Sequence, residues 1–132
     1  MAPMLSGLDH LVLTVASIEA SIAFYRDALG MEPEVFHPND GSARWALKFG
    51  SQKINLHQAG AEFEPKAAVA QAGTADLCFL SDVALDDWQC HLTTRGVTVI
   101  EGPVRRTGAT GPIISLYLRD PDGNLIEISN RV

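Results

Sequence analysis

Side chains able to bind a divalent metal recur at similar places in the two halves of this sequence of 132 residues. Each half opens with an apolar segment that carries one such side chain and closes with a segment that carries another. The four residues are His10, His57, Asp76 and Glu127. Two imidazoles and two carboxylates suit a cation of borderline softness, such as Zn, Ni, Mn, Co or Fe. Three or four protein ligands leave coordination positions open for water or substrate.

The segments around these residues show the alternation that is typical of strands. In each segment apolar residues occupy one face, and the candidate metal ligand lies on the other. The segments are 8–15, 52–58, 74–80 and 124–129. We therefore expect the four side chains to face a shared concave surface that holds a ligand.

Helices and further strands complete the pattern. Ser17 is expected to cap a helix that ends at Gly30, and Asp82 or a neighbour is expected to cap a second helix that ends at Gly96. Further extended segments are expected at 32–37, 43–49, 97–100 and 112–119. A turn is expected at 120–123, and a flexible loop at 106–112.

The chain is therefore predicted to be α+β, with the order β-α-β-β-β present twice. Two paired modules, at about 5–59 and 73–132, are joined by a linker at 60–72. Together they are expected to form a single domain with a cupped, partly open, barrel-like sheet and the helices outside.

Composition excludes several other classes of protein. A net charge of −6 and a pI near 5.0 argue against nucleic acid as the main partner. The sequence has no apolar run of the length that crosses a membrane and no framework of disulfides. We expect a cytoplasmic protein that binds a small molecule.

The chain resembles the vicinal oxygen chelate superfamily in three segments: LDHLVLTVASIEASIAFYRDALGME, KINLHQ and GPIISLYLRDPDGNLIEIS. The superfamily includes glyoxalase I, extradiol dioxygenases, fosfomycin-resistance enzymes, methylmalonyl-CoA epimerase and bleomycin-binding proteins. The opening D-H-x-x-L-x-V and the closing D-P-D-G-N-x-x-E are its most specific motifs here. The resemblance extends from about Leu8 to Ser129, and the short glyoxalase-domain-containing proteins are the most similar subgroup.

The resemblance implies a metal-dependent lyase or isomerase whose substrate chelates the metal through adjacent oxygens. It places the metal positions of the family on His10, His57, Asp76 and Glu127, with Glu127 as the first candidate for the catalytic base and Asp76 as the second. Many members of the family have His where this chain has Asp76, so the usual iron site of an extradiol dioxygenase is incomplete. The resemblance also implies a homodimer.

Other residues could line the substrate pocket. Trp45, Phe49, Tyr117 and Arg119 are the candidates. Two alternative functions stay open: an Fe(II) extradiol dioxygenase that acts on a catechol, and a metal-free protein that sequesters a small molecule, as bleomycin-binding proteins do.

Overall fold

The computed structural model describes residues 2–132, and each half of the chain forms a four-stranded sheet with one helix. The first unit ends at Ala70, and the second unit runs from Gln71 to Val132. The elements are β1 (His10–Val15), α1 (Ile18–Asp27), β2 (Glu32–Phe36), β3 (Arg44–Phe49), β4 (Gln52–Gln58), β5 (Asp76–Leu80), α2 (Leu85–Thr94), β6 (Glu101–Thr107), β7 (Pro112–Arg119) and β8 (Leu125–Arg131). This confirms the α+β class and the predicted repeat. Within residues 2–132, no helix has the length and apolar character needed to cross a membrane.

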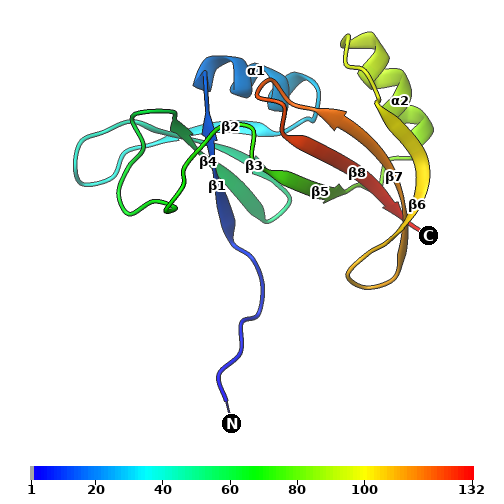
Figure 1. Cartoon of the computed structure of the whole chain (residues 1–132), viewed down its shortest axis with the longest axis horizontal. Coiled ribbons are helices and arrows are strands. Elements are labelled where there is room, and N and C mark those ends of the chain that lie inside the picture. Colours follow the sequence, from blue (N-terminus) through cyan, green and yellow to red (C-terminus); the bar gives the residue numbers. More distant parts are fainter. Residues whose placement is uncertain (1) are drawn as a thin grey trace. The chain divides into compact units, whose positions relative to one another are not determined.

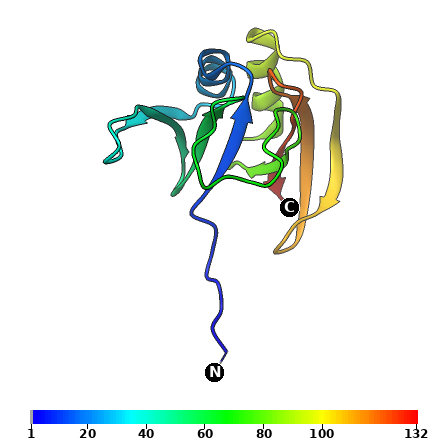
Figure 2. The same cartoon turned by 60° about the vertical axis from the view of Figure 1, so that its left-hand side comes forward.

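The first sheet has the strand order β1-β4-β3-β2 (Figure 1). β1 and β4 run parallel, and the other neighbours are antiparallel. One face packs against α1, which contacts β2, β3 and β4 (Figure 2). The main buried apolar side chains of this unit are Leu13, Val15, Tyr25, Leu47, Ile54 and Leu56. Because strand side chains alternate, His10 and His57 lie on the opposite face.

α1 begins where the sequence predicts. The Ser17 hydroxyl accepts a hydrogen bond from the Ala20 amide at 3.1 Å, which satisfies one of the free amides of the first turn. Beyond the helix, Gly30 has φ 71°, a left-handed conformation that glycine adopts without steric cost. These two residues fix the length of the helix.

The second sheet has the order β5-β8-β7-β6, with β5 and β8 parallel. α2 packs against β8. The buried apolar side chains of this unit are Leu85, Leu92, Ile113, Leu116, Leu118, Ile126 and Ile128. Glu127 lies between two of these residues in sequence and therefore on the opposite face of β8.

The predicted cap of α2 is wrong. The N-cap residue is Ala84, which makes no side-chain hydrogen bond, and Asp82 lies outside the helix. The first amide of the helix, that of Leu85, instead donates to the Asn130 side-chain oxygen at 3.1 Å. A distant residue on β8 therefore performs the role for which a local cap was expected.

The predicted strand at 97–100 and the predicted loop at 106–112 are also displaced in the structure. β6 occupies Glu101–Thr107, and only 108–111 remain as a loop. The strand contains Gly102 and Pro103, which are rare inside strands, and the register shifts there between Glu101 and Val104. β6 tolerates both because it is an edge strand.

Candidate functional site

Both predicted histidines lie on the face of the first sheet that α1 does not cover, which we call the open face, but at different positions along the strands. In the parallel register His10 is the partner of Lys53, and His57 is the partner of Thr14. His10 thus lies at the beginning of β1, and His57 lies close to the end of that strand. The two imidazoles share a face but do not lie in one row across the sheet.

The environment of His10 leaves one of its ring nitrogens available to bind a metal. Its Nδ1 lies 2.8 Å from Asp9 Oδ2, and 43% of its side chain is exposed. Because a carboxylate only accepts hydrogen bonds, Nδ1–H is the donor. The other nitrogen, Nε2, is then unprotonated in the neutral ring and can bind a metal, an arrangement common among metal-binding histidines.

His57 has a different environment. The residue is only 9% exposed, and its ring packs edge to face against Phe63 at 5.5 Å between centroids. The Arg44 guanidinium lies 3.8 Å from the centre of the same Phe63 ring. Burial, and then the positive charge of Arg44, lower the pKa of His57 below its ordinary value of 6.5. His57 is therefore a neutral imidazole at pH 7.

A pocket of about 250 Å³ lies beside His57. Val12 and Thr14 of β1 form one part of its wall, and Pro65 and Lys66 form another. The predicted linker thus packs, over 65–70, on the open face of the first sheet. Neither ring nitrogen of His57 hydrogen-bonds to another residue of the described chain.

Trp45 and Phe49 do not occupy the place predicted for them. On β3, Trp45 is the register partner of Leu56, and Leu47 is the partner of Ile54. Trp45 and Phe49 therefore share the face of the buried leucines, on the side of α1, and neither lines the pocket beside His57. The alternation of side chains on β3 was predicted correctly, but alternation alone does not show which face of the sheet lies away from the helix.

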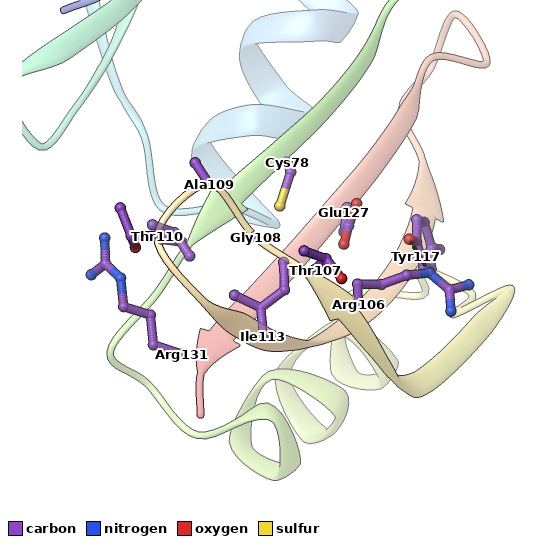
Figure 3. A pocket seen from close by; sticks show the side chains of 11 residues that line it. Cys78, Arg106, Thr107, Gly108, Ala109, Thr110, Ile113, Tyr117, Glu127 and Arg131 are labelled. Carbon is purple, nitrogen blue, oxygen red and sulfur yellow. Dashed lines mark hydrogen bonds between the residues drawn. The ribbon is translucent and has the colours of Figure 1, made fainter.

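The second unit has a larger pocket, of about 410 Å³, on the face of its sheet opposite α2 (Figure 3). Cys78 on β5, Glu127 on β8 and Tyr117 on β7 are register partners and form one row across the pocket floor. Figure 3 shows Glu127 between the other two. Glu127 and Tyr117 were predicted from the sequence to face a pocket, and the structure places both in this one.

The Glu127 carboxylate is held through one of its oxygens. The Ser115 hydroxyl donates to Oε2 at 2.5 Å, and the Ser129 hydroxyl lies 3.4 Å from the same atom. The other oxygen, Oε1, has no hydrogen-bond partner among the described residues. Glu127 therefore presents one fixed and one available oxygen, as a metal ligand or a proton acceptor needs.

Arg106 lines the pocket but was not among the pocket residues predicted from the sequence. Its Nε donates to the Tyr117 hydroxyl at 2.9 Å, and its terminal nitrogen lies 3.4 Å from Glu101. Hydrogen bonding to Tyr117 raises the pKa of Arg106, so the guanidinium stays charged. Arg119 does not line the pocket, and its guanidinium donates to the Gly123 carbonyl.

Cys78 lines the pocket beside the Glu127 carboxylate. Partial burial above all raises the pKa of its thiol, and the charge and close approach of the Glu127 carboxylate and the charge of Asp76 act in the same direction, whereas a hydrogen bond from Ser129 opposes the change. The thiol therefore stays protonated near neutral pH. Asp76 lies two residues before Cys78 on β5 and shares its face.

The two registers show which positions of the units correspond. His10 and Asp76 each begin the first strand of their unit. Glu127 lies two residues beyond the register partner of Asp76, and Asn55 lies two residues beyond the register partner of His10. His57 lies two residues farther along β4 than Asn55. Oδ1 of Asn55 is buried with no hydrogen-bond partner in residues 2–132. The counterpart of the carboxylate is therefore an amide and not an imidazole.

No three His, Cys, Asp or Glu side chains of residues 2–132 gather into a group that could hold a metal ion. Two of the predicted ligands, His10 and His57, belong to the first unit, and the other two, Asp76 and Glu127, belong to the second. That the four act together stays a prediction.

Comparison with known proteins places the chain in a family. The model of the Glyoxalase/Bleomycin resistance protein/Dioxygenase superfamily matches residues 7–128. The chain is 51% identical over 129 residues to Virulence protein STM3117 of Salmonella typhimurium, covering 98% of this chain and 87% of that protein. It is 27% identical over 125 residues to Metallothiol transferase FosB of Staphylococcus epidermidis, covering 95% and 84% respectively.

Solved structures agree with the sequence relatives. A protein from the mobile metagenome of V. Pseudocholerae is 54% identical with a TM-score of 0.94, and the match covers 100% of this chain and 99% of that one. Lactoylglutathione lyase from Agrobacterium tumefaciens is 25% identical with a TM-score of 0.69, and the match covers 96% and 95%. The chain therefore belongs to the Glyoxalase/Bleomycin resistance protein/Dioxygenase superfamily.

Proposed function

We propose that the chain is a divalent-metal-dependent lyase or isomerase that acts on a small substrate with two adjacent oxygen atoms. The observation that carries the proposal is Glu127, a carboxylate in a pocket of about 410 Å³ with one oxygen fixed and the other available. Two relatives, named as a lactoylglutathione lyase and a metallothiol transferase, support an enzyme of this kind.

Single donor atoms of the chain suit a divalent metal, although no three such side chains gather within residues 2–132. Nε2 of His10 is available because Nδ1–H is bonded to Asp9, and Oε1 of Glu127 is available because the serines hold Oε2. We propose His10, Asp76 and Glu127 as ligands of Zn, Ni, Mn, Co or Fe. When bound, such a metal supplies Lewis acidity toward the adjacent oxygens of the substrate.

The other pocket residues have roles of their own in the proposed reaction. Glu127, which lines the pocket, is the first candidate for the base that accepts the substrate proton, and Asp76, which lies outside the pocket lining, is the second. The Arg106 guanidinium and the Tyr117 hydroxyl bind a polar group of the substrate, because both line the same pocket as Glu127. The apolar wall that includes Leu80 and Ile113 accommodates the rest of the molecule.

His57 is left out of the proposed ligand set. It stands two residues beyond the counterpart of Glu127, and its ring is buried against Phe63. Burial keeps the imidazole neutral, which a ligand needs, but the ring faces the pocket under residues 65–70 of its own unit.

Elemental analysis of the purified protein tests the proposal. Wild type should hold about one divalent metal per chain. His10→Ala and Glu127→Ala should lose the metal, whereas the controls His37→Ala and Glu19→Ala, which alter exposed residues, should keep it. Equal trace amounts of metal in all five proteins would overturn the proposal.

Two further measurements separate the alternatives. Oxygen uptake with a catechol and Fe(II) would favour an extradiol dioxygenase over a lyase or isomerase. Binding of a small ligand that persists unchanged after chelator treatment would favour a metal-free binding protein. We further propose that the protein is a cytoplasmic homodimer. Sedimentation tests the dimer, since a species of one-chain mass at micromolar concentration would contradict it.

A further inference from the structure

Two arginines and an isoleucine form a row across the second sheet, next to the loop at 108–111. Arg106 on β6 is the register partner of Ile113 on β7, and Ile113 is the partner of Arg131 on β8. All three line the pocket of about 410 Å³, and Figure 3 shows Ile113 between the two arginines. We call these three residues the arginine row.

The charge of this pocket is opposite to that of the whole chain. The chain has a net charge of −6, yet the described residues that line the pocket include two arginines, Arg106 and Arg131, and one acid, Glu127. Charges that line a pocket set the local field and so the sign of the ligands that it attracts. The arginine row therefore makes its side of the pocket favourable for a negative group.

Within residues 2–132, one of the two guanidiniums is paired and the other is not. That of Arg106 donates to the Tyr117 hydroxyl at 2.9 Å and lies 3.4 Å from Glu101. Arg131 is exposed, and its side chain has no hydrogen-bond or ion-pair partner in this part of the chain. A guanidinium is charged at neutral pH and has five N–H donors in a planar fork. Arg131 can therefore bind a ligand without first breaking a contact within the protein.

An apolar stretch separates this guanidinium from the acid of the pocket. Arg131 and Glu127 are four residues apart on the same face of β8, which places their Cα atoms about 13 Å from each other. Leu80, the register partner of Ser129, lines the pocket at the level between them. A ligand that reaches both groups must therefore have an apolar middle part.

We infer that the pocket takes an organic anion, a molecule with an apolar body and one acidic group that binds Arg131. The inference names the substrate class of the proposed function, and it rests on that function where it places the reactive end of the molecule at Glu127. A guanidinium binds a carboxylate through two parallel hydrogen bonds, and other oxyanions in a similar way. The body of the molecule lies against Ile113 and Leu80, which offer it apolar contacts only.

Fluorescence titration of the full-length protein with two probes tests the inference. Anilinonaphthalene sulfonate has an apolar body and one sulfonate, and phenylnaphthylamine is the same molecule without the sulfonate. Arg131→Gln should weaken binding of the sulfonate probe about tenfold, the usual effect of losing a hydrogen bond to a charged group. Its affinity for phenylnaphthylamine should equal that of wild type, because the apolar wall is unchanged.

Arg105→Gln is the matched control. Arg105 is an exposed residue of β6 and the register partner of Ile114, so it lies on the opposite face of the sheet and outside the pocket lining. The variant removes the same charge from the chain as Arg131→Gln does. A loss that reflects only the net charge of the protein should therefore appear equally in both variants.

A loss of the sulfonate probe alone, in Arg131→Gln but not in Arg105→Gln, supports the inference. Equal affinities of Arg131→Gln and wild type for the sulfonate probe would overturn it, as would a wild type that does not bind this probe. Equal losses in the two variants, or equal losses of the two probes in Arg131→Gln, would also contradict it, because Arg131 would then not recognise the anion. Neither probe needs a metal, so a wild type without metal in elemental analysis would overturn the proposed function and leave these results as they are.

Discussion

His57 makes the stability of the protein depend on pH. Its pKa in the folded state is lowered from 6.5, first by burial and then by Arg44, whereas the unfolded chain keeps the ordinary value. The unfolded state therefore binds more protons below pH 6.5, and the free energy of unfolding falls as the pH decreases from there toward the folded pKa. Above pH 6.5 this contribution is constant.

Urea unfolding at pH 7.5 and pH 5.5 checks this expectation. The stability difference between wild type and His57→Gln should be smaller at the lower pH, because the glutamine cannot take up a proton. His37→Gln, at an exposed position, serves as control and should follow wild type at both pH values. A difference between wild type and His57→Gln that stays constant would contradict the lowered pKa.

Some site residues could be predicted because the sequence makes them locally conspicuous. Glu127 stands between two isoleucines of a strand, where an acid is costly unless it has a function or a partner. Arg106 lacked such a signal, because Gly102 and Pro103 are untypical of strands and the strand on which Arg106 lies was therefore not predicted. The pairing of Asp9 with His10 could have been proposed from their adjacency, since a carboxylate beside an imidazole selects its tautomer.

At the scale of elements, the start of α2 depends on β8. Asn130 accepts from the Leu85 amide and donates to the carbonyls of Ser81 and Val83, at 2.9 Å each. Asn130→Ala should therefore lower the free energy of unfolding by about 1–2 kcal/mol, the usual cost of losing a helix cap. Asn39→Ala, in an exposed turn, should change it by less than about 0.5 kcal/mol. Urea unfolding of the three proteins measures both values, and equal stability of the two variants would contradict the role of Asn130.

The elements that could be predicted are those whose signals are local. α1 has its cap and its terminal glycine within the segment itself, and the turn after β7 is closed by Asp120, whose carboxylate accepts from the amides of Asp122 and Asn124. The start of α2 and the position of β6 depend on distant partners, namely Asn130 and the neighbouring strand β7. Residue propensity and spacing contain no information about such partners. The predicted cap of α2 and the predicted position of β6 therefore differ from the structure.

At the scale of the whole molecule, the repeat constrains which residues can have equivalent roles. The sequence pattern matched His57 with Glu127 because both lie on the last strand of a unit. The pairing registers show that Asn55 is the counterpart once His10 is matched with Asp76, the first residues of β1 and β5. The fold of each unit was therefore predictable, but the correspondence between the units was not.

This correspondence yields a prediction that separates the two ligand sets. If His57 belongs to the pocket beneath residues 65–70, His57→Gln should retain about one divalent metal per chain, as wild type does. His10→Gln, the matched change on the same sheet face, should lose it, because it removes the nitrogen left available by Asp9. Elemental analysis after gel filtration measures both. A His57→Gln protein that folds but loses its metal would restore the set of four ligands and show that position on a strand face, and not register, selects the ligands.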